Sequence, residues 1–357
     1  MEIKITRTAS PRPKPEDPTK LGFGTVFTDH MFTMDYEAER GWHDAKIIPL
    51  TDISIHPGAA VFHYGAEVFE GLKAYRTDDG SVQLFRPADN MQRMQDSAER
   101  IQLPDFDADF LLSAILRLVE LDQDWGPNVP SASLYIRPFE FCTDVDLGLH
   151  SIAHAKMMVI LSPVGSYLSG GLKPVDILIE DTDVRAVRGG TGYAKCGGNY
   201  AAANRAAARA ERKGFQQVLW LDGVHRQYIE EVGGMNVMFK IGGKIVTPSL
   251  TGSVLPGITR RSCIQLLKDK GYEVEERLIS VEEVMSALEK GEMEEAWGCG
   301  TAAVISPIGS FAYRDKQQVV NNRQIGPCAQ NLYYTLTGIQ WGRREDSHGW
   351  IVKVPKN

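Results

Sequence analysis

The chain has 357 residues, a hydrophobic share of 43% and a formal net charge of -7 at pH 7. These values are typical of a globular protein, and two domains of ordinary size are the natural expectation. The acidic balance and the scattered lysines and arginines argue against a surface that binds nucleic acid or an anionic membrane. Neither a signal-peptide pattern nor a bilayer-spanning apolar run is present, so we expect a cytoplasmic protein.

The five cysteines are far apart in the sequence and form no C-x-x-C pair, and the eight histidines show no metal-ligand spacing. Zinc sites and disulfide frameworks require such spacings. We therefore predict neither a metal site nor a disulfide framework. Prolines at 11, 13, 15 and 18 indicate a loosely ordered N-terminal arm.

The first half of the chain has the pattern of a mixed α and β region. Apolar segments on either side of Asp78-Asp79-Gly80 predict a β-hairpin. Pro87 is suited to open a helix, and Pro104 to stop it. Apolar residues at helical spacing predict a second helix. The expected elements are strands at 72–76 and 82–85, helices at 87–103 and 107–125, and strands at 132–141 and 156–161.

The segment SPVGSYLSGG (162–171) is the best linker candidate because of its Gly, Ser and Pro content. We predict a smaller α/β domain at 1–162 with the N-terminal arm, a linker at 163–173 and a larger domain at 174–357. The larger domain is expected to contain strands at 175–179, 217–221, 235–240, 244–246 and 294–297, and helices at 199–213, 258–270 and 281–290.

The most informative segment is GGTGYAKCGGNY (189–200), which surrounds Lys195. Glycines let the backbone approach a ligand closely, and an amine in a tight pocket becomes a nucleophile toward an aldehyde. The segment is not a Walker A loop, because Cys196 stands where Ser or Thr is required, and it lacks the third glycine of the dinucleotide fingerprint. By itself it fits a catalytic lysine and a solvated loop lysine equally.

Glu231, within YIEEVGGMN (228–236), stands at a predicted strand-to-loop transition. A carboxylate beside two glycines can approach a flat ligand and keep a ring nitrogen protonated. Taken alone, Glu231 is more readily interpreted as a solvated acid at a strand edge.

Two segments are suited to binding an anion. Pro256-Gly257 leads directly into a predicted helix whose first residues are Ile258 and Thr259, and unpaired N–H groups there favour phosphate. The segment GCGTAA (298–303) exposes backbone N–H groups beside the Thr301 hydroxyl, which suits phosphate or carboxylate. The alternatives are a plain helix start and a tight turn between strands.

Tyr135 and Arg137 are expected on one face of a strand, because side chains alternate along a strand. Arg137 could bind a carboxylate through its fork of donors. Taken alone, Arg137 is more readily a paired surface arginine, and Arg93 an ordinary solvated charge on a helix.

Together these motifs resemble those of branched-chain amino acid aminotransferases, which are pyridoxal-phosphate enzymes of fold type IV. The resemblance implies a two-domain, mixed α/β (α+β) fold of the D-amino acid aminotransferase-like type. The motifs follow the family order over nearly the whole chain: FTDHM (27–31), YG (64–65), FEGLKA (69–74), LFRP (84–87), YIRP (135–138), Lys195 with GGNY (197–200), EVG (231–233), LPGITR (255–260) and GTA (300–302).

The resemblance implies pyridoxal 5'-phosphate as the cofactor. Lys195 would hold it as an internal Schiff base, Glu231 would pair with the pyridine nitrogen, and Tyr200 would hydrogen-bond the phenolic oxygen. Further residues would hold the phosphate, and one arginine would line the cofactor pocket. The phosphate contacts are Arg93, Ile258, Thr259 and Thr301, and the pocket arginine is Arg185.

The resemblance also implies how the substrate is held. Its α-carboxylate would be received by two tyrosines and a backbone turn, its side chain by an apolar pocket, and the side-chain carboxylate of glutamate by Arg137. The carboxylate contacts are Tyr64, Tyr135 and the backbone at Thr301-Ala302, and the apolar pocket residues are Phe23, Phe69 and Tyr167.

In this family a loop of a second subunit completes the pocket, so we expect a homodimer in which LGLH (147–150) contributes.

Mammalian relatives carry a C-x-x-C after the Thr-Ala pair. Here Ala303 and Ser306 occupy those places, so thiol redox control of that kind is expected to be absent. Gly234 replaces a frequent threonine, which removes one hydroxyl contact to the cofactor.

The implied reaction is transamination between L-leucine, L-isoleucine or L-valine and 2-oxoglutarate, giving branched 2-oxo acids and L-glutamate by a ping-pong route through pyridoxamine phosphate. The freed amine of Lys195 would move a proton, and Glu231 would keep the cofactor an electron sink. Two alternatives remain. One is another fold type IV enzyme, either a D-amino acid aminotransferase or an aminodeoxychorismate lyase. The other is a catalytically silent protein that binds a phosphate ligand at Ile258.

Overall fold

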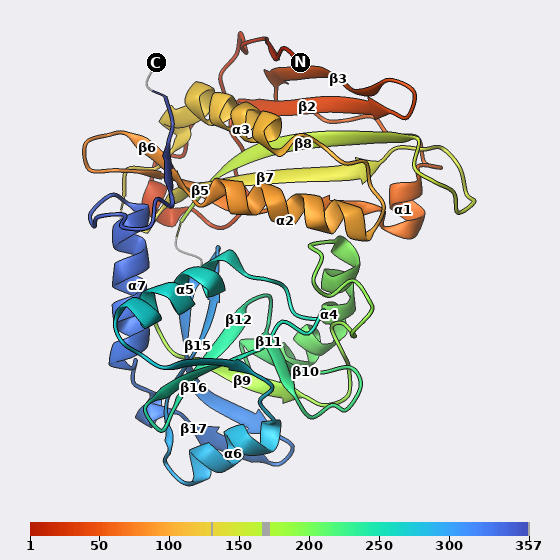
Figure 1. The fold of residues 1–357 in the computed structure, drawn as a ribbon. Coiled ribbons are helices and arrows are strands. Elements are labelled where there is room, and N and C mark those ends of the chain that lie inside the picture. Colours follow the sequence, from red (N-terminus) through yellow and green to blue (C-terminus); the bar gives the residue numbers. More distant parts are fainter. Residues whose placement is uncertain (130, 166–171, 356–357) are drawn as a thin grey trace. The chain divides into compact units, whose positions relative to one another are not determined.

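The computed structural model describes residues 1–129, 131–165 and 172–355. The chain divides into two compact units (Figure 1). Unit 1 comprises Met1–Tyr167, Ala194–Gly197 and Gly338–Asn357, and unit 2 comprises Leu168–Tyr193 and Gly198–Thr337. Lys195 therefore belongs to unit 1. The domain division into 1–162, 163–173 and 174–357 stays a prediction.

Unit 1 is built on a nine-stranded sheet. Its strands are β1 (Lys4–Ile5), β2 (His30–Glu37), β3 (Gly41–Pro49), β4 (Glu67–Phe69), β5 (Leu72–Arg76), β6 (Val82–Phe85), β7 (Ser133–Cys142), β8 (His154–Val164) and β18 (Ile351–Lys353). The order is β1-β3-β2-β8-β7-β5-β6-β18, and β4 pairs with β7 in addition. The β1–β3 pairing is parallel, and the others are antiparallel.

The helices of unit 1 are α1 (Ala60–Tyr64), α2 (Pro87–Arg100) and α3 (Ala108–Asp122), with 3-10 turns at Pro18–Lys20 and Gln123–Trp125. Pro87 opens α2 as expected, because a proline at the first helical position lacks only an N–H that would be unpaired anyway. Asp107 caps α3 by accepting a hydrogen bond from the Phe110 N–H at 2.9 Å.

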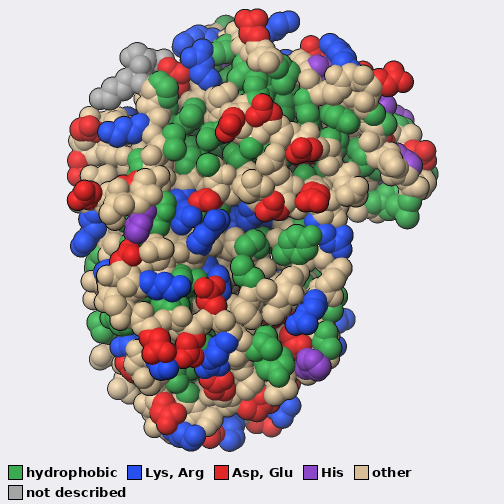
Figure 2. Space-filling view, in the orientation of Figure 1, with side chains coloured by type: hydrophobic (Ala, Val, Ile, Leu, Met, Phe, Trp, Pro, Cys, Tyr) green, Lys and Arg blue, Asp and Glu red, His purple; other side chains and the backbone are tan. Residues whose placement is uncertain are grey.

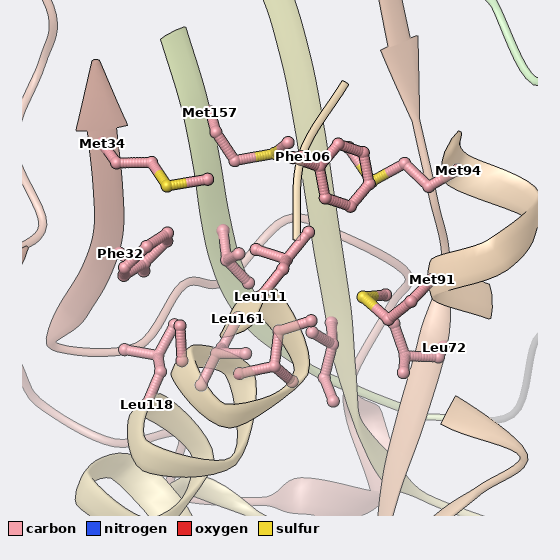
Figure 3. Packing of buried hydrophobic residues seen from close by; sticks show 14 of the residues in the cluster. Phe32, Met34, Leu72, Met91, Met94, Phe106, Leu111, Leu118, Met157 and Leu161 are labelled. Carbon is pink, nitrogen blue, oxygen red and sulfur yellow. The ribbon is translucent and has the colours of Figure 1, made fainter. Parts of the chain in front are cut away.

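The main core of unit 1 lies where α2 and α3 pack against the sheet (Figure 3). Methionines contribute much of it, and their flexible thioethers fill irregular gaps between helix and sheet. This packing fixes α2, which carries Arg93 and Ser97, relative to β4. The residues labelled in Figure 3 are Phe32, Met34, Leu72, Met91, Met94, Phe106, Leu111, Leu118, Met157 and Leu161.

Unit 2 contains a second nine-stranded sheet of the order β11-β10-β9-β16-β15-β12-β13-β14, with β17 paired to β16. The strands are β9 (Val175–Glu180), β10 (Gln217–Leu221), β11 (Ile229–Val232), β12 (Asn236–Ile241), β13 (Lys244–Pro248), β14 (Val274–Arg277), β15 (Met293–Gly300), β16 (Val304–Tyr313) and β17 (Lys316–Val319). The helices are α4 (Gly197–Arg212), α5 (Ile258–Asp269), α6 (Val281–Glu289) and α7 (Pro327–Gln340), with a 3-10 turn at Asn321–Arg323.

Both faces of the sheet in unit 2 are covered around β9. Ile177 and Ile179 belong to one apolar cluster, which includes Val284 of α6. Leu178 points the other way, into a cluster with Ala206 of α4. A strand covered on both faces is expected to carry consecutive apolar residues, as Ile177, Leu178 and Ile179 do within VDILIE.

Most of the elements expected in both halves of the chain are confirmed, with shifted ends. The hairpin of β5 and β6 is present, with Ala74 opposite Leu84. The helix expected at 107–125 ends at Asp122 and continues as a 3-10 turn. The strand expected at 156–161 runs from His154 to Val164. The antiparallel pair β2 and β3 was not foreseen.

The described residues show mixed surface charge. On the face drawn in Figure 2, acidic and basic side chains are interspersed. Within 1–129, 131–165 and 172–355, no helix is long and apolar enough to cross a membrane, and no group of three or more His, Cys, Asp or Glu side chains could hold a metal ion. The five cysteines are free and buried.

A buried acid interrupts the core side of β7. Glu140 is fully buried, and both of its carboxyl oxygens are without a hydrogen-bond partner in the described part of the chain. Burial, reinforced by the negative charge of Asp105, raises the pKa of Glu140 well above its usual range. The folded protein therefore binds a proton at Glu140 more tightly than the unfolded chain does.

This shift predicts a loss of stability as the pH rises. The stabilisation is fully present below the unfolded-state pKa of Glu140 and is lost as the pH rises through the raised folded-state pKa. Glu140→Gln cannot ionise, so it should remove this dependence and lose less stability than the original protein between pH 6 and pH 9. Urea unfolding at pH 6 and pH 9 gives the free energy of unfolding of the original protein and of Glu140→Gln, and so measures the pH dependence of each. The exposed Glu99→Gln on α2 serves as the control, and an unchanged pH slope in Glu140→Gln would contradict the assignment.

Candidate active site

The backbone of Lys195 is attached to two elements of unit 1. Its N–H donates to Ser97 Oγ of α2 at 2.8 Å, and its carbonyl accepts from the Phe69 N–H of β4 at 3.0 Å. The next residue, Cys196, forms an isolated antiparallel bridge with Val68 of β4. The lysine segment is therefore joined to β4 by an isolated bridge, and this fixes the direction in which the Lys195 side chain leaves the backbone.

Two cations share the ring of Phe69. The Lys195 Nζ lies 4.4 Å from the ring centroid, and the Arg137 guanidinium carbon lies 4.7 Å from it. Arg137 also donates to the Tyr135 hydroxyl at 3.1 Å. The ring of Tyr135 in turn makes an edge contact with Phe23, with centroids 4.9 Å apart. Five residues singled out from the sequence thus form one cluster on unit 1.

Arg93 is held by a buried carboxylate rather than by solvent. Its Nε donates to Glu70 Oε1 at 2.6 Å and its second nitrogen to Glu70 Oε2 at 3.0 Å. Asn90 and the Gly71 N–H add hydrogen bonds to Glu70 at 2.8 and 2.9 Å. Burial alone would raise the pKa of Glu70, but Arg93 and the other donors hold it below its usual value. The interpretation of Arg93 as a solvated helix charge is therefore wrong.

Tyr64 is the last residue of α1, and its hydroxyl donates to the Leu147 carbonyl. The side chain is partly exposed. The structure therefore gives its hydroxyl a backbone partner in the segment 145–150. Tyr167 lies outside the described residues.

In unit 2, Glu231 is buried and is held at both oxygens. Oε1 accepts from the Leu255 N–H at 2.7 Å, and Oε2 lies 3.1 Å from Arg185 Nε as an ion pair without directed hydrogen-bond geometry. Arg185 also donates to the carbonyl oxygens of Gly192 and Ser253. The interpretation of Glu231 as a solvated edge acid is wrong, because Glu231 is 3% exposed.

The helix α5 begins at Ile258 after Gly257, and no side chain caps it. Its first N–H groups are therefore available to an anion. Gly257 lets the backbone pass close to Asn236, because a Cβ at this position would force the Asn236 side chain to shift. Asn236 also holds the preceding loop by donating to the Leu255 carbonyl at 2.9 Å. Ile258 and Thr259 are buried at this helix start.

The turn at 301–303 connects β15 to β16, where Gly300 pairs with Val304. Thr301 is partly exposed in this turn. Tyr200 lies in the first turn of α4 and is 38% exposed. Each of these residues lies in unit 2, as do Glu231 and the start of α5.

Several residues of these clusters were not singled out from the sequence. Glu70 was quoted within a motif but given no role, and its position beside a glycine in FEG was the available signal. Ser97 and Asn236 lack any local signal, because their partners are 98 and 19 residues away. Glu67, whose Oε1 accepts a hydrogen bond from the Gly197 N–H, was also missed.

The chain matches the model of the amino-transferase class IV family over residues 67–311. It belongs to this family and is an aminotransferase. It is 52% identical to the "Branched-chain-amino-acid aminotransferase 2" of Bacillus subtilis (strain 168), over 99% of this chain and 97% of that protein.

Solved structures show the same architecture. The branched-chain amino acid aminotransferase of Escherichia coli is 30% identical, with a TM-score of 0.75 over 90% of this chain and 99% of that one. Another branched-chain amino acid aminotransferase, solved in complex with N-(5'-phosphopyridoxyl)-L-glutamate, is 25% identical, with a TM-score of 0.72 over 94% and 99%. The expected fold type IV architecture is confirmed.

The Glu70–Arg93 pair generates a stability prediction. Glu70→Gln should destabilise the protein by about 3–5 kcal/mol, because it leaves a buried guanidinium without a counter-charge. The double variant Glu70→Gln/Arg93→Gln should lose less than Glu70→Gln alone, because both charges are gone. Urea unfolding of the two single variants and the double variant measures the coupling. If the stability losses of Glu70→Gln and Arg93→Gln simply add up to the loss of the double variant, the two side chains do not act as a buried pair.

Proposed function

We propose that this protein is a branched-chain amino acid aminotransferase that uses pyridoxal 5'-phosphate and transfers the amino group of L-leucine, L-isoleucine or L-valine to 2-oxoglutarate. The observation that carries the proposal is the attachment of Lys195 to β4 and α2, which presents its amine on the same ring as Arg137. The names of the relatives, at about half identity over nearly the full length, support the choice of substrate.

The hydrogen-bonding and charged groups of the chain fit pyridoxal phosphate. The uncapped start of α5 behind Gly257 offers backbone N–H groups suited to a phosphate. Glu231 is buried and already ion-paired, which suits a carboxylate that must stay charged beside a pyridine nitrogen. In this proposal Arg93, Thr301 and the α5 start hold the phosphate.

Pyridoxal phosphate supplies an electron sink when bound. The protein's residues supply the proton transfer. We assign to Lys195 the attachment of the cofactor and the movement of the proton at the substrate Cα, because its backbone is fixed and its amine lies over the Phe69 ring that we assign to the substrate side chain. Tyr200 is assigned to the phenolic oxygen, and Arg185 to holding Glu231.

One site must accept both an apolar and an acidic side chain over two half-reactions. Phe23, Phe69 and Tyr135 provide apolar surface for the branched chain. Arg137 lies on that surface and can bind the side-chain carboxylate of glutamate or 2-oxoglutarate. Tyr64 and the Thr301-Ala302 turn are assigned to the α-carboxylate. This arrangement supports a ping-pong exchange in which the amino group is first taken from one substrate and then given to the other.

A homodimer is part of the proposal. Leu147 and Leu149 are 67% and 85% exposed, and Phe62 and Val145 are also exposed on unit 1. Exposed apolar side chains in one segment favour a protein interface. The occupant we propose is a second copy of this chain, and sedimentation of the purified protein tests it. A cytoplasmic location stays a prediction.

Lys195→Ala should abolish transamination and remove the visible absorption of the bound cofactor. The expected loss is at least about 10²–10⁴-fold, the range for removing a positioned proton-transfer group. Borohydride treatment of the original protein, followed by mass spectrometry, should find the cofactor fixed at Lys195. Lys213→Ala, an exposed lysine at the end of α4, is the matched control. Full activity in Lys195→Ala would refute the assignment.

The substrate class is tested with a panel of amino donors and 2-oxoglutarate as the acceptor. L-Leucine, L-isoleucine and L-valine should give kcat/KM values well above that of D-alanine, and aminodeoxychorismate should not be cleaved. A preference for D-alanine would identify a D-amino acid aminotransferase. Cofactor binding without any turnover would identify a silent binding protein.

A further inference from the structure

We propose that Glu67 determines the balance between apolar and acidic side chains by acting as a resident counter-charge to Arg137 on the substrate face of unit 1. The inference rests on the proposed function, because it concerns how one site accepts both kinds of substrate. Glu67 lies on β4, two residues before Phe69.

The sheet register places Glu67 and Arg137 on the same face. Glu67 is paired with Phe141 of β7, and Phe69 with Phe139. Residues opposite each other on paired strands share a face, and so do residues two apart on one strand. Arg137 on β7 therefore points to the side of Glu67 and Phe69. Its 4.7 Å contact with the ring of Phe69 agrees with this placement.

Glu67 is held in place by the lysine segment. Its Oε1 accepts a hydrogen bond from the Gly197 N–H, two residues after Lys195. The approach is so close that a Cβ at residue 197 would clash with this oxygen. The carboxyl group is partly buried. The side chain is thus a fixed feature of the face rather than a mobile surface acid.

Arg137 retains donor capacity on this face. One terminal nitrogen donates to the Tyr135 hydroxyl at 3.1 Å. Its Nε is buried and has no hydrogen-bond partner among the residues that the structure describes. Arg137 as a whole is only partly buried, so the remaining donors of its guanidinium, which lies beside two aromatic rings, can bind a carboxylate from a substrate.

The local charges couple Glu67 to Arg137 and Lys195. Burial raises the pKa of Glu67, while the Gly197 N–H and the positive charges of Arg137 and Lys195 oppose that rise. The pKa of Glu67 is raised on balance, and the N–H donor and the two cations limit that rise by stabilising the ionised carboxylate. Its negative charge in turn reduces the positive potential that Arg137 presents to a substrate.

The counter-charge has opposite effects on the two kinds of substrate. When a branched apolar side chain covers the face and excludes water, Glu67 compensates the charge of Arg137, which would otherwise be desolvated alone. When the side chain ends in a carboxylate, Glu67 repels it and competes for Arg137. Glu67 therefore favours leucine-like side chains and weakens the binding of glutamate-like ones.

Two nonreactive acids of similar shape test this inference. Glutarate carries a second carboxylate where 4-methylpentanoate carries two methyl groups. Their dissociation constants are measured by calorimetry on the cofactor-loaded protein. In Glu67→Gln, whose amide oxygen can still accept from Gly197, glutarate should bind about tenfold more tightly, the effect expected for loss of a unit charge several Å away. Binding of 4-methylpentanoate should be unchanged or a few-fold weaker.

Control variants separate the effect of the Glu67 charge from a structural effect of the Glu67 side chain. Glu67→Asp keeps the charge and should keep the original ratio of the two constants, and the exposed Glu39→Gln should change neither. Glu67→Ala should reproduce the changed ratio, which keeps the test decisive if the glutamine variant folds poorly. Equal changes for both acids in Glu67→Gln and Glu67→Ala would show a structural role only and overturn the inference.

Failure of the inference about Glu67 can be distinguished from failure of the proposed function. If the original protein does not transaminate L-leucine with 2-oxoglutarate, the proposed function fails. If it does, and KM for 2-oxoglutarate in Glu67→Gln does not fall relative to KM for L-leucine, only the role of Glu67 fails.

Discussion

The site on unit 1 depends on a short backbone attachment between the lysine segment and β4. The Phe69 N–H, the Ser97 hydroxyl and the bridge between Val68 and Cys196 hold a chain segment that comes from far along the sequence. Backbone hydrogen bonds suit this task, because they fix the path of the chain independently of side-chain rotamers. These bonds fix the position of the Lys195 backbone, from which its amine reaches the ring of Phe69.

Two buried ion pairs, one within each unit, follow one pattern. Each charge is paired before any ligand arrives: Arg93 with Glu70 in unit 1, and Glu231 with Arg185 in unit 2. A charge fixed in advance by protein partners costs no reorganisation when a charged ligand binds. Glu140 departs from the pattern, because its carboxyl lies in an apolar core without partners among the described residues. The neutral, protonated form of the Glu140 carboxyl is therefore the form that this apolar core favours.

Local signals in the sequence predicted much of this structure, and the limits of those signals explain what was missed. Pro87, the helical spacing of apolar residues after residue 107 and the turn at Asp78-Asp79-Gly80 marked elements whose causes are local. The environments of Arg93 and Glu231 were misjudged when read alone, because burial depends on partners distant in sequence. The motif pattern over the whole chain corrected this by implying the family. The motif pattern gave no role to Glu67, because its placement on the same face as Arg137 follows only from the register of β4 with β7.

The C-terminal strand has a consequence for synthesis of the chain. Residues Ile351–Lys353 form β18, which pairs with β6 at the end of the sheet order of unit 1. Because β18 lies far along the chain from β6, the ribosome makes the long intervening segment before β6 acquires this partner. Until then the hairpin of β5 and β6 presents an open edge, which is prone to pairing with other chains. We expect truncations that remove these last residues to aggregate during expression, even though they leave every assigned catalytic residue in place.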